Sequence, residues 1–361
     1  MKTKYLQVAN LIKQRLDNGV YAVHSLPGER KIASEMGVSY VTARQAIQHL
    51  VGANVLNRKS NGRLKVNHEH DELKQGLRVA MVFPFHVDGG AYRFWYDMLK
   101  HGLSEIGGTL IPMAYTHWDD PQILRAINGD LDGIFIVPPE QMPPILRQRI
   151  GGSTAKVVTL WHDLTDMGIP CLDGSGPENV ELLIEHLAQL GHQKIDCFNV
   201  QPLNDVIEHR IECWRKALKK RGLTGQLHNR PVRAFEWVGE ASKDYMNELM
   251  DSEQLGASAV FCTVSASARG VYRAAIEHGC EIGRELGICT FGELRESMLL
   301  CPSLTTVDTT DKKQLCKLVN KFFKWMQDKD APWLGPLVVR PQTANLFIGE
   351  STIGSCKVTR D

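Results

Sequence analysis

The chain has 361 residues, of which 43% are hydrophobic and 23% charged. This composition excludes a disordered or collagen-like chain, and the length exceeds what one core usually serves, so we expect two or three globular units. No apolar run is long enough to span a membrane and the N-terminal stretch is not that of a signal peptide, which predicts a cytoplasmic protein. The nine cysteines include no C-x-x-C pair and predict reduced thiols.

Charge is distributed unevenly along the chain. The net charge is only +1, but residues 1–68 hold 11 Lys and Arg against 3 Asp and Glu. The first segment therefore carries +8 and the remainder −7. A small basic domain joined to a large acidic one indicates a module that binds a polyanion such as nucleic acid.

Three helices and a hairpin are predicted in the basic segment. Apolar residues at helical spacing predict helices at about 5–16, 27–36 and 40–51. Gly37 permits the turn before the third helix, and Ser39 is a favourable N-cap for it. The Asn-Gly dipeptide at 61–62, between the short runs 55–59 and 63–66, predicts a β-hairpin. This order is typical of a winged helix-turn-helix domain that binds DNA.

The polar side of the third helix and the hairpin tip carry the predicted DNA contacts. The helix turns its alanines and Ile47 inward, which leaves Tyr40, Thr42 and Arg44 nearer the solvent. The hairpin, or wing, carries Arg58, Lys59 and Arg63 beside a glycine, so its backbone can approach a phosphate or enter the minor groove.

The string LPGERKIASEMGVSYVTARQAI, followed by NGRLKV, closely resembles the winged-helix domain of GntR-family transcriptional regulators over about residues 4–66. The positions that meet DNA in that family are held here by Arg30, Ser39, Thr42, Arg44 and Gly62. Two positions depart from the family pattern. Gly28 replaces a small polar residue, and Tyr40 stands where the family most often has an arginine that reads guanine. The resemblance therefore does not fix the operator sequence.

Residues 68–76 are polar and lack apolar periodicity, which predicts a linker between a DNA-binding domain at 1–67 and a second domain at 77–361. His68, His70 and Asp71 are of the types that bind zinc or nickel. Linkers are commonly charged and no further ligand converges on these three, so we expect no metal and no other cofactor.

Beyond residue 77, buried-strand runs alternate with amphipathic helices, the pattern of parallel sheets covered on both faces. Two consecutive sets of this kind predict an α/β fold in which a winged helix-turn-helix precedes two doubly wound lobes with a ligand cleft at the strand carboxyl ends. The expected strands are 77–83, 109–113, 133–137, 157–160, 195–199, 232–237, 259–263 and 286–290, and the expected helices are 94–106, 121–128, 178–190, 206–221, 243–250 and 266–278.

Five strings in this region resemble the effector-binding domain of LacI-family repressors, which is similar to periplasmic sugar-binding proteins. They are LDGIFIVPP at 131–139, ENVELLIEHLAQLGHQKI at 178–195, HRIECWRKALKKRG at 209–222, AVFC at 259–262 followed by ARGVYRAAIEHG, and SLTTV at 303–307. The resemblance covers about 77–350, and its combination with the basic head is similar to the arabinose-repressor type of regulator. It implies a first lobe at about 77–173 and 308–330, a second lobe at about 174–307 and 331–361, and a homodimer on operator DNA.

Ligand contacts carry over unevenly from that family. Phe94 matches its aromatic residue at a helix start, and Arg210 matches its sugar-binding arginine. In that family, carboxylates at three positions bind sugar hydroxyls. Two of these carboxylates are lost here, because Trp161-His162 and Val264-Ser265 occupy their positions. At the third position Glu293 keeps an acid, in an altered turn. The candidate effector-binding residues are Phe85, Tyr92, Phe94, Trp95, Trp161, His162, Arg210, Ser265 and Glu293. Aromatic rings stack on sugars and an arginine pairs with an anion, so a modified or anionic saccharide is expected.

The sequence shows none of four common catalytic motifs at the start of a helix that follows a strand: a nucleophile elbow, a phosphate-binding loop, a zinc-protease motif or a dinucleotide fingerprint. We therefore expect that the protein is not an enzyme. The expected function is a transcriptional regulator, acting as a repressor, whose operator affinity a small molecule controls. Two alternatives stay open. One is an exported or cytoplasmic sugar receptor, and the other is a DNA-binding regulator whose cleft no longer binds a ligand.

Overall fold

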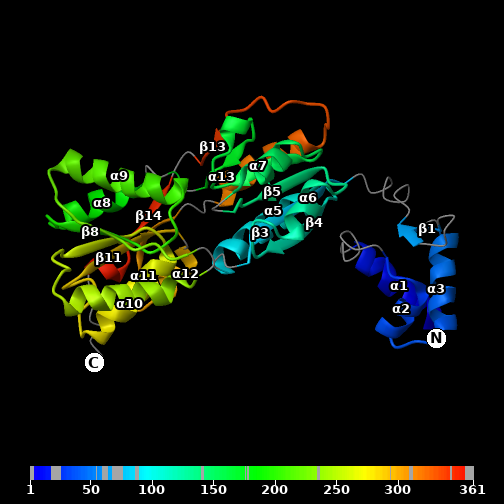
Figure 1. Ribbon diagram of the computed structural model, residues 1–361, viewed down its shortest axis with the longest axis horizontal. Helices are drawn as coiled ribbons and strands as arrows, with labels where there is room; N and C mark the ends of the chain where they lie inside the picture. Colours follow the sequence, from blue (N-terminus) through cyan, green and yellow to red (C-terminus); the bar gives the residue numbers. More distant parts are fainter. Residues whose placement is uncertain are drawn as a thin grey trace.

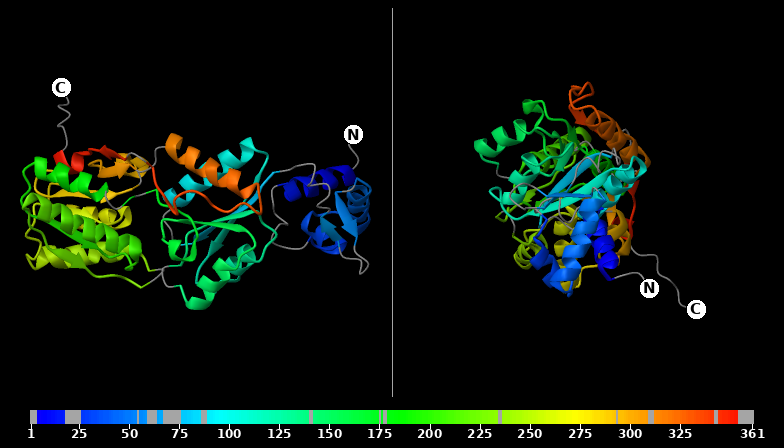
Figure 2. Two further views of the ribbon diagram at one scale, coloured as in Figure 1. Left: turned by 90° about the horizontal axis from the view of Figure 1, so that it is seen from above. Right: turned by 90° about the vertical axis from the view of Figure 1, so that its right-hand side faces the viewer.

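A computed structural model of the chain describes residues 4–17, 26–53, 55–58, 64–66, 76–85, 89–139, 142–174, 176, 179–233, 236–292, 294–308, 312–341 and 344–353. Figure 1 shows a small head at one end, followed by two larger lobes. In Figure 2 the head lies beside the first lobe, and the second lobe lies at the opposite end. The predicted linker at 68–76 lies outside the described residues, except for Gly76. In the part of the chain that is described, no helix is both long and apolar enough to cross a bilayer.

The described residues of the head form three helices and a two-stranded sheet. Its helices are α1 (Lys4–Asp17), α2 (Glu29–Glu35) and α3 (Tyr40–Gly52). The strands β1 (Leu56–Arg58) and β2 (Leu64–Val66) pair antiparallel, with Arg58 opposite Leu64. Ser39 caps α3 as expected, because its Oγ accepts a hydrogen bond from the Thr42 N–H at 3.2 Å. The inner faces of the helices meet in a core of Val8, Ile12, Ile32, Ala43, Ala46, Ile47, Leu50 and Leu56.

The first lobe is built on a six-stranded parallel sheet in the order β13-β7-β6-β5-β3-β4. Its elements in chain order are β3 (Arg78–Pro84), α5 (Gly89–Glu105), β4 (Thr109–Tyr115), α6 (Pro121–Ile127), β5 (Gly133–Ile136), α7 (Pro144–Gly151), β6 (Lys156–Leu160), η1 (Thr165–Met167), β7 (Cys171–Leu172), α13 (Lys312–Met326) and β13 (Val338–Val339). Alternate residues of β3 face opposite sides. Val79, Met81 and Phe83 pack under α5 and α13, whereas Ala80 and Val82 pack under α6 and α7. Both faces are covered, which explains the continuous apolar run.

The second lobe has a sheet in the order β14-β12-β11-β10-β8-β9. Its elements are α8 (Val180–Gln189), β8 (Ile195–Asn199), α9 (Asp205–Arg221), β9 (Leu227–Asn229), α10 (Val238–Asp251), β10 (Ala259–Cys262), α11 (Ser265–Glu277), β11 (Gly287–Phe291), α12 (Leu294–Leu299), β12 (Thr305–Asp308), β14 (Asn345–Phe347) and α14 (Glu350–Ile353). Among the strands that the structure describes in this sheet, only β14 runs antiparallel to its neighbour, β12. The α/β fold with a winged head and two sheet-based lobes is therefore confirmed.

The chain passes between the lobes three times, after β7, after β12 and after β13. The Arg340 Nε donates to Asp173 Oδ2 at 2.8 Å, which ties the third crossing to the first. Because β13 pairs with β7, residues 338–339 belong to the first lobe, and the expected return to the second lobe at residue 331 is wrong. The sequence pattern cannot show which sheet a two-residue strand joins.

One predicted strand and two predicted helix starts differ from the structure. The strand expected at 232–237 is absent from the described part of that segment, and β9 at Leu227–Asn229 is the edge strand beside β8. Pro231 has no N–H to donate, and Trp237 is 82% exposed rather than packed in a sheet. Helices α5 and α10 begin at Gly89 and Val238, about one turn before the expected 94 and 243. Glycine at or near each start weakened the helical pattern there.

Candidate functional site

Two candidate sites follow from this architecture, a polar surface on the head and a cleft between the lobes. On the head, Arg30, Ser39, Tyr40 and Arg44 are exposed, and Arg58 lies on the neighbouring wing strand. Thr42 is half-buried, and its Oγ1 lies 2.8 Å from Ser39 Oγ. The structure therefore brings six of the nine predicted DNA-contact residues to the start of α2, the start of α3 and the adjoining strand. Lys59, Gly62 and Arg63 lie outside the described residues.

An acidic residue that sequence reasoning missed lies at the centre of this surface. Tyr40 Oη donates to Glu29 Oε2 at 2.8 Å, and Arg58 Nη2 donates to Glu29 Oε1 at 2.5 Å. Glu29 was passed over because an acid is not expected to face DNA. Its position directly before Arg30, a predicted contact, was the available signal.

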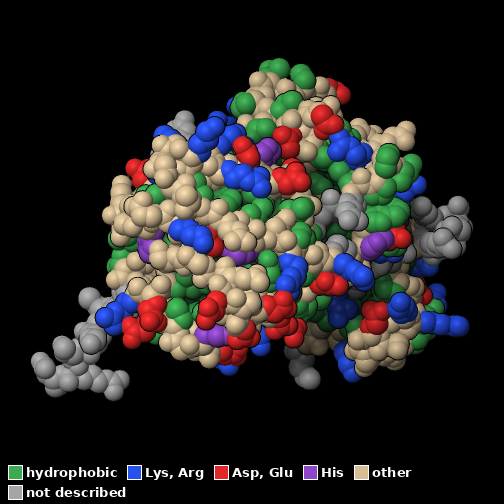
Figure 3. All heavy atoms as spheres, turned by 60° about the vertical axis from the view of Figure 1, so that its left-hand side comes forward, with side chains coloured by type: hydrophobic (Ala, Val, Ile, Leu, Met, Phe, Trp, Pro, Cys, Tyr) green, Lys and Arg blue, Asp and Glu red, His purple; other side chains and the backbone are tan. Residues whose placement is uncertain are grey.

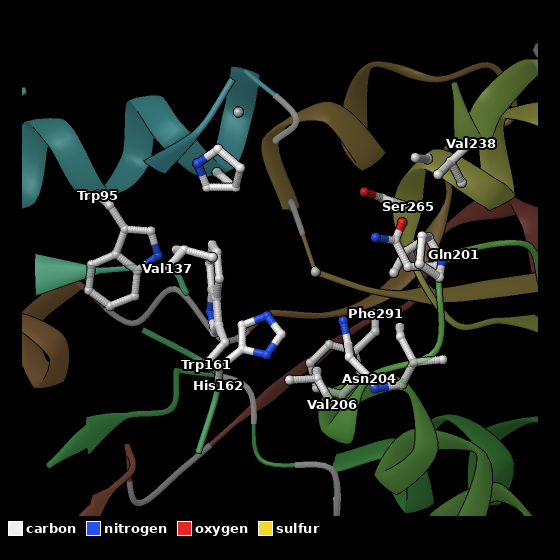
Figure 4. A pocket seen from close by; sticks show the side chains of 18 of the residues that line it. Trp95, Val137, Trp161, His162, Gln201, Asn204, Val206, Val238, Ser265 and Phe291 are labelled. Carbon is white, nitrogen blue, oxygen red and sulfur yellow. Dashed lines mark hydrogen bonds between the residues drawn. The ribbon is translucent and has the colours of Figure 1, made fainter. Parts of the chain in front are cut away.

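The cleft lies where the strands of both sheets end, and its volume is about 1700 Å³. Figure 4 shows Trp95, Trp161 and His162 from the first lobe facing Gln201, Ser265 and Phe291 from the second. Parallel strands place their carboxyl ends at one edge, so residues far apart in sequence converge there. The volume exceeds the roughly 300–1,000 Å³ typical of small-molecule pockets, and the cleft is partly open to solvent.

Aromatic side chains form the first-lobe wall of the cleft. Trp161 lies edge-on to Phe83 at 5.9 Å and to Trp95 at 6.1 Å, and Phe94 packs against Trp95 at 5.6 Å. Trp161 has a φ of 68°, which is strained for a bulky residue. Strain of this kind clusters at functional sites, and here it holds the indole at the end of β6.

Tyr92 is not among the residues that line this cleft, which corrects the prediction that it contacts the effector. It stacks on Tyr96 at 6.2 Å and meets Phe83 edge-on at 5.7 Å. The helix α5 begins at Gly89 and therefore includes Tyr92, which lies beside Tyr96. The residues of α5 that line the cleft include Phe94, Asp97 and His101. Phe85, by contrast, lines the cleft while 76% exposed.

Arg210 on α9 contributes a buried cation to the second-lobe wall. Its Nη1 donates to the Thr263 carbonyl oxygen at 2.7 Å, and its guanidinium lies 4.2 Å from the centre of the Phe291 ring. Burial lowers the pKa of Arg210 to about 10, against the raising influence of Asp173. The side chain therefore remains protonated at neutral pH and offers positive charge in a medium of low dielectric constant.

A polar network behind Arg210 fixes the carbonyl that holds it. Thr263 Oγ1 donates to Asn199 Oδ1 at 2.6 Å, and Asn199 Nδ2 donates to Asn229 Oδ1 at 2.8 Å. Asn199 and Asn229 end β8 and β9, and Thr263 directly follows β10, so the sheet places the three side chains together. Ser265 begins α11 and also lines the cleft, whereas the predicted contact Glu293 lies outside the described residues.

One contact joins the lobes beside the cleft. The carboxylate of Asp205, in the first turn of α9, lies 2.9 Å from His162 Nδ1 and accepts the backbone N–H of Asp163 at 2.9 Å. Burial alone raises the pKa of Asp205, but the hydrogen bonds and the charge of His162 together lower it. Sequence reasoning missed Asp205, although a polar pair at a predicted helix start, Asn204-Asp205, was a usable signal.

Other charged groups at the cleft are mostly paired. Arg93 donates to Asp97 at 2.8 Å, and Arg269 donates to Glu296 at 2.9 Å. On the face of the molecule drawn in Figure 3, acidic and basic side chains are likewise interspersed rather than gathered by sign. Within the described residues, no three His, Cys, Asp or Glu side chains are grouped as metal ligands would be. His68, His70 and Asp71 lie outside that part.

Two family models match parts of this chain. Residues 4–66 match the model of bacterial regulatory proteins of the gntR family, and residues 184–351 match the model of a periplasmic binding protein-like domain. Curated relatives include the HTH-type transcriptional regulator MalR of Clostridium butyricum, 28% identical over 33% of this chain and 35% of its own length. The ribose operon repressor of Escherichia coli K12 is 27% identical over 35% of this chain and 38% of its own. The chain thus spans less than half the length of these relatives.

Solved structures show the same fold at low sequence identity. A LacI family transcriptional regulator from Mycobacterium smegmatis superposes with a TM-score of 0.64 at 18% identity, covering 76% of this chain and 98% of that one. A lac repressor dimer bound to operator and the anti-inducer ONPF gives 0.64 at 17% identity, covering 80% and 99%. The chain therefore matches the gntR-family model over its head and the periplasmic binding protein-like model over part of its body, and its fold is similar to that of solved LacI-family regulators.

Proposed function

We propose that this protein is a sequence-specific DNA-binding transcriptional regulator, acting as a repressor, whose operator affinity is controlled by a small molecule bound between its lobes. The observation that carries the proposal is the joining, in one chain, of an exposed polar recognition helix to a two-lobed cleft with a buried cation. The matching relatives are named as regulators and repressors of transcription, which supports this role over a catalytic one.

The head supplies the DNA contacts in this proposal. Arg30, Tyr40, Thr42, Arg44 and the wing residues read the operator, and Ser39 holds the start of the recognition helix. Two heads in a homodimer would engage the two half-sites of a near-palindrome, since dimer symmetry is mirrored in the DNA. A dimeric relative bound to operator supports this arrangement.

The cleft supplies the control. Its first-lobe wall of Phe94 and Trp161 suits the apolar face of a sugar ring, and Arg210 opposite suits an anionic group. We infer an effector that is a saccharide or an anionic saccharide derivative. Effector binding that favours one arrangement of the lobes would change the spacing of two heads, and a coupling of about 1–3 kcal/mol would alter operator affinity roughly 5- to 150-fold.

The test of effector binding is a thermal-shift screen of the full chain against neutral sugars, uronic acids and sugar phosphates. A ligand present at about 100 times its Kd stabilises the protein by about 2.7 kcal/mol. Any compound that raises the melting temperature is then added to a titration of the protein's own promoter DNA, with random DNA as control. The proposal requires a preference for the promoter at moderate salt and a change in that preference with the compound.

Two variants on α9 locate the binding site. Arg210→Gln removes the cleft cation and is expected to abolish the shift given by an anionic ligand, whereas Arg215→Gln alters an exposed arginine on the same helix and keeps it. A promoter preference without any ligand response favours a regulator whose cleft no longer binds an effector. A ligand response without DNA binding favours a sugar receptor and refutes the regulator.

A further inference from the structure

Tyr40 and Arg58 are held together on the head by a carboxylate between them. Glu29 begins α2, Tyr40 begins α3, and Arg58 ends β1, so three separate elements meet at this point. Tyr40 Oη donates to one carboxylate oxygen of Glu29 at 2.8 Å, and Arg58 donates to the other at 2.5 Å. The side chain of Glu29 is only 13% exposed, whereas that of Arg58 is 45% exposed and the residue Tyr40 is 43% exposed.

The carboxylate is in its ionised form, which sets the direction of the tyrosine hydrogen bond. Burial works to raise the pKa of Glu29, but the hydrogen bonds from Arg58 and Tyr40, together with the charges of Arg58 and Arg44, lower it overall. An ionised carboxylate can only accept hydrogen bonds. The phenol proton of Tyr40 is therefore committed to Glu29, and the phenol oxygen keeps only its lone pairs for another partner.

The major groove distinguishes bases by their donors and acceptors. Adenine presents the N6 amino donor and cytosine the N4 amino donor, whereas guanine presents the O6 acceptor and thymine the O4 acceptor at the corresponding edge. An acceptor at Tyr40 suits the amino bases and is repelled by the keto oxygens. The N-terminal residues of a recognition helix are the ones that contact base edges, and Tyr40 is the first residue of α3.

Resting on the proposed function, we propose that Tyr40, oriented by Glu29, selects adenine or cytosine at one operator position. Glu29 is a positioning residue that acts through Tyr40, and its second carboxylate oxygen also holds the side chain of Arg58, at the end of β1, close to Tyr40. An arginine at position 40 would donate hydrogen bonds to guanine and so prefer that base. The phenol oxygen of Tyr40 accepts instead, so the expected base preference is the opposite one. Arg44, which is exposed one turn further along α3, retains the chemistry to read guanine.

The experiment is selection of binding sites from a random duplex library by the full chain, followed by affinity measurements on single-base variants of the selected site. The wild type is expected to enrich a half-site with adenine or cytosine at one position. Replacement by guanine or thymine there is expected to weaken binding about 2- to 12-fold, the range for a single hydrogen bond. Tyr40→Phe keeps the ring but removes the oxygen, and is expected to abolish this preference while preserving the others.

A second variant and a control separate direct reading from general damage. Glu29→Gln offers an amide N–H₂ that can donate to the phenol oxygen, so the phenol proton becomes available and guanine or thymine is expected to be accepted at that position. Tyr5→Phe removes a hydroxyl from a half-buried tyrosine that packs against the core of the head, and should leave every base preference unchanged.

The outcomes distinguish the two proposals. If the wild type enriches no sequence, the proposed function as a sequence-specific regulator is refuted, and the proposed role of Tyr40 is refuted as well. If it enriches a defined site that Tyr40→Phe reads as the wild type does, or if guanine is preferred at the position sensitive to Tyr40, only the role of Tyr40 is overturned. Loss of the amino-base preference in Tyr40→Phe, its relaxation in Glu29→Gln and its retention in Tyr5→Phe support it.

Discussion

Asp205→Ala removes the carboxylate that joins the two lobes beside the cleft. In the wild type this group bridges His162 Nδ1 and the Asp163 N–H, each at 2.9 Å, across from the first turn of α9. Both partners follow β6 in the first lobe, so the substitution acts on the contact between lobes and leaves the core of each lobe intact. We expect the variant to be less stable and its lobes to be held less firmly together.

The size of the effect follows from the number and exposure of these bonds. A hydrogen bond to a charged group contributes about 1.5–3 kcal/mol when sheltered. The side chain of Asp205 is 35% exposed, so solvent screening reduces that contribution, and we expect a total loss of about 1–3 kcal/mol. For a domain of this size each kcal/mol lowers Tm by about 2–4 °C. Asp205→Asn keeps an oxygen for the Asp163 N–H but loses the charge, so its loss should be smaller.

The measurement is thermal unfolding of the full chain followed by calorimetry, with small-angle scattering to follow the separation of the lobes. Glu208→Ala is the matched control, because it removes an exposed acid from the same first turn of α9. The reasoning is refuted if Asp205→Ala and Glu208→Ala have the same Tm and the same radius of gyration.

The pH dependence of the same contact gives an independent check. The folded-state pKa of Asp205 lies below the ordinary carboxyl value of about 3.9. Its contribution is therefore complete above that ordinary value and is lost as the pH falls through the lowered pKa. The stability difference between wild type and Asp205→Asn should shrink as the pH falls below that ordinary carboxyl value, so a difference that grows in this acidic range contradicts the assignment.

Three further substitutions and one control substitution test the head and the second lobe. Arg44→Ala should weaken specific DNA binding by about 1–3 kcal/mol in an equilibrium titration while leaving binding to random DNA nearly unchanged, if the guanidinium reads a base. Ser39→Ala removes the N-cap of α3 and should destabilise that helix by about 1 kcal/mol, seen as faster amide hydrogen exchange in its first turn. Gly270→Ala would place a Cβ 2.3 Å from the Gly239 carbonyl oxygen and force α10 from α11, at a cost of about 1–3 kcal/mol in urea unfolding. Gly239→Ala is the control, because its Cβ would lie 3.6 Å from the nearest atom, the Ala266 carbonyl oxygen, and should be tolerated.

Local patterns predicted most of the elements because they depend on short stretches of chain. The run from Val79 to Phe83 packs on both faces of its sheet, and the spacing of Ala43, Ala46 and Leu50 places one face of α3 in the core of the head. Where a glycine stood near a helix start, as at Gly89 and Gly239, the pattern was too weak and the predicted start came a turn late. The segment 232–237 was misassigned because its apolar residues resemble a strand, although Trp237 is exposed.

The candidate sites divide in the same way. The resemblance supplied Phe94 and Arg210, and both line the cleft. It could not exclude Tyr92, because the expected helix began at 94 and left Tyr92 in the preceding loop, whereas α5 includes Tyr92 and places it beside Tyr96. Asp205 and Glu29 were missed since each gains its meaning from partners distant in sequence, His162 for the first and Tyr40 with Arg58 for the second.

The amino-acid sequence by itself determined a basic helix-turn-helix joined to an acidic body of alternating strands and helices, because periodicity, capping residues and charge are written locally. Only the tertiary structure decided which sheet the short returning strand Val338–Val339 joins and which side chains converge at the cleft. It also decided that the proton of Tyr40 points to Glu29. These features depend on contacts between elements far apart in the chain, and such contacts exist only once the sheets and the head have assembled.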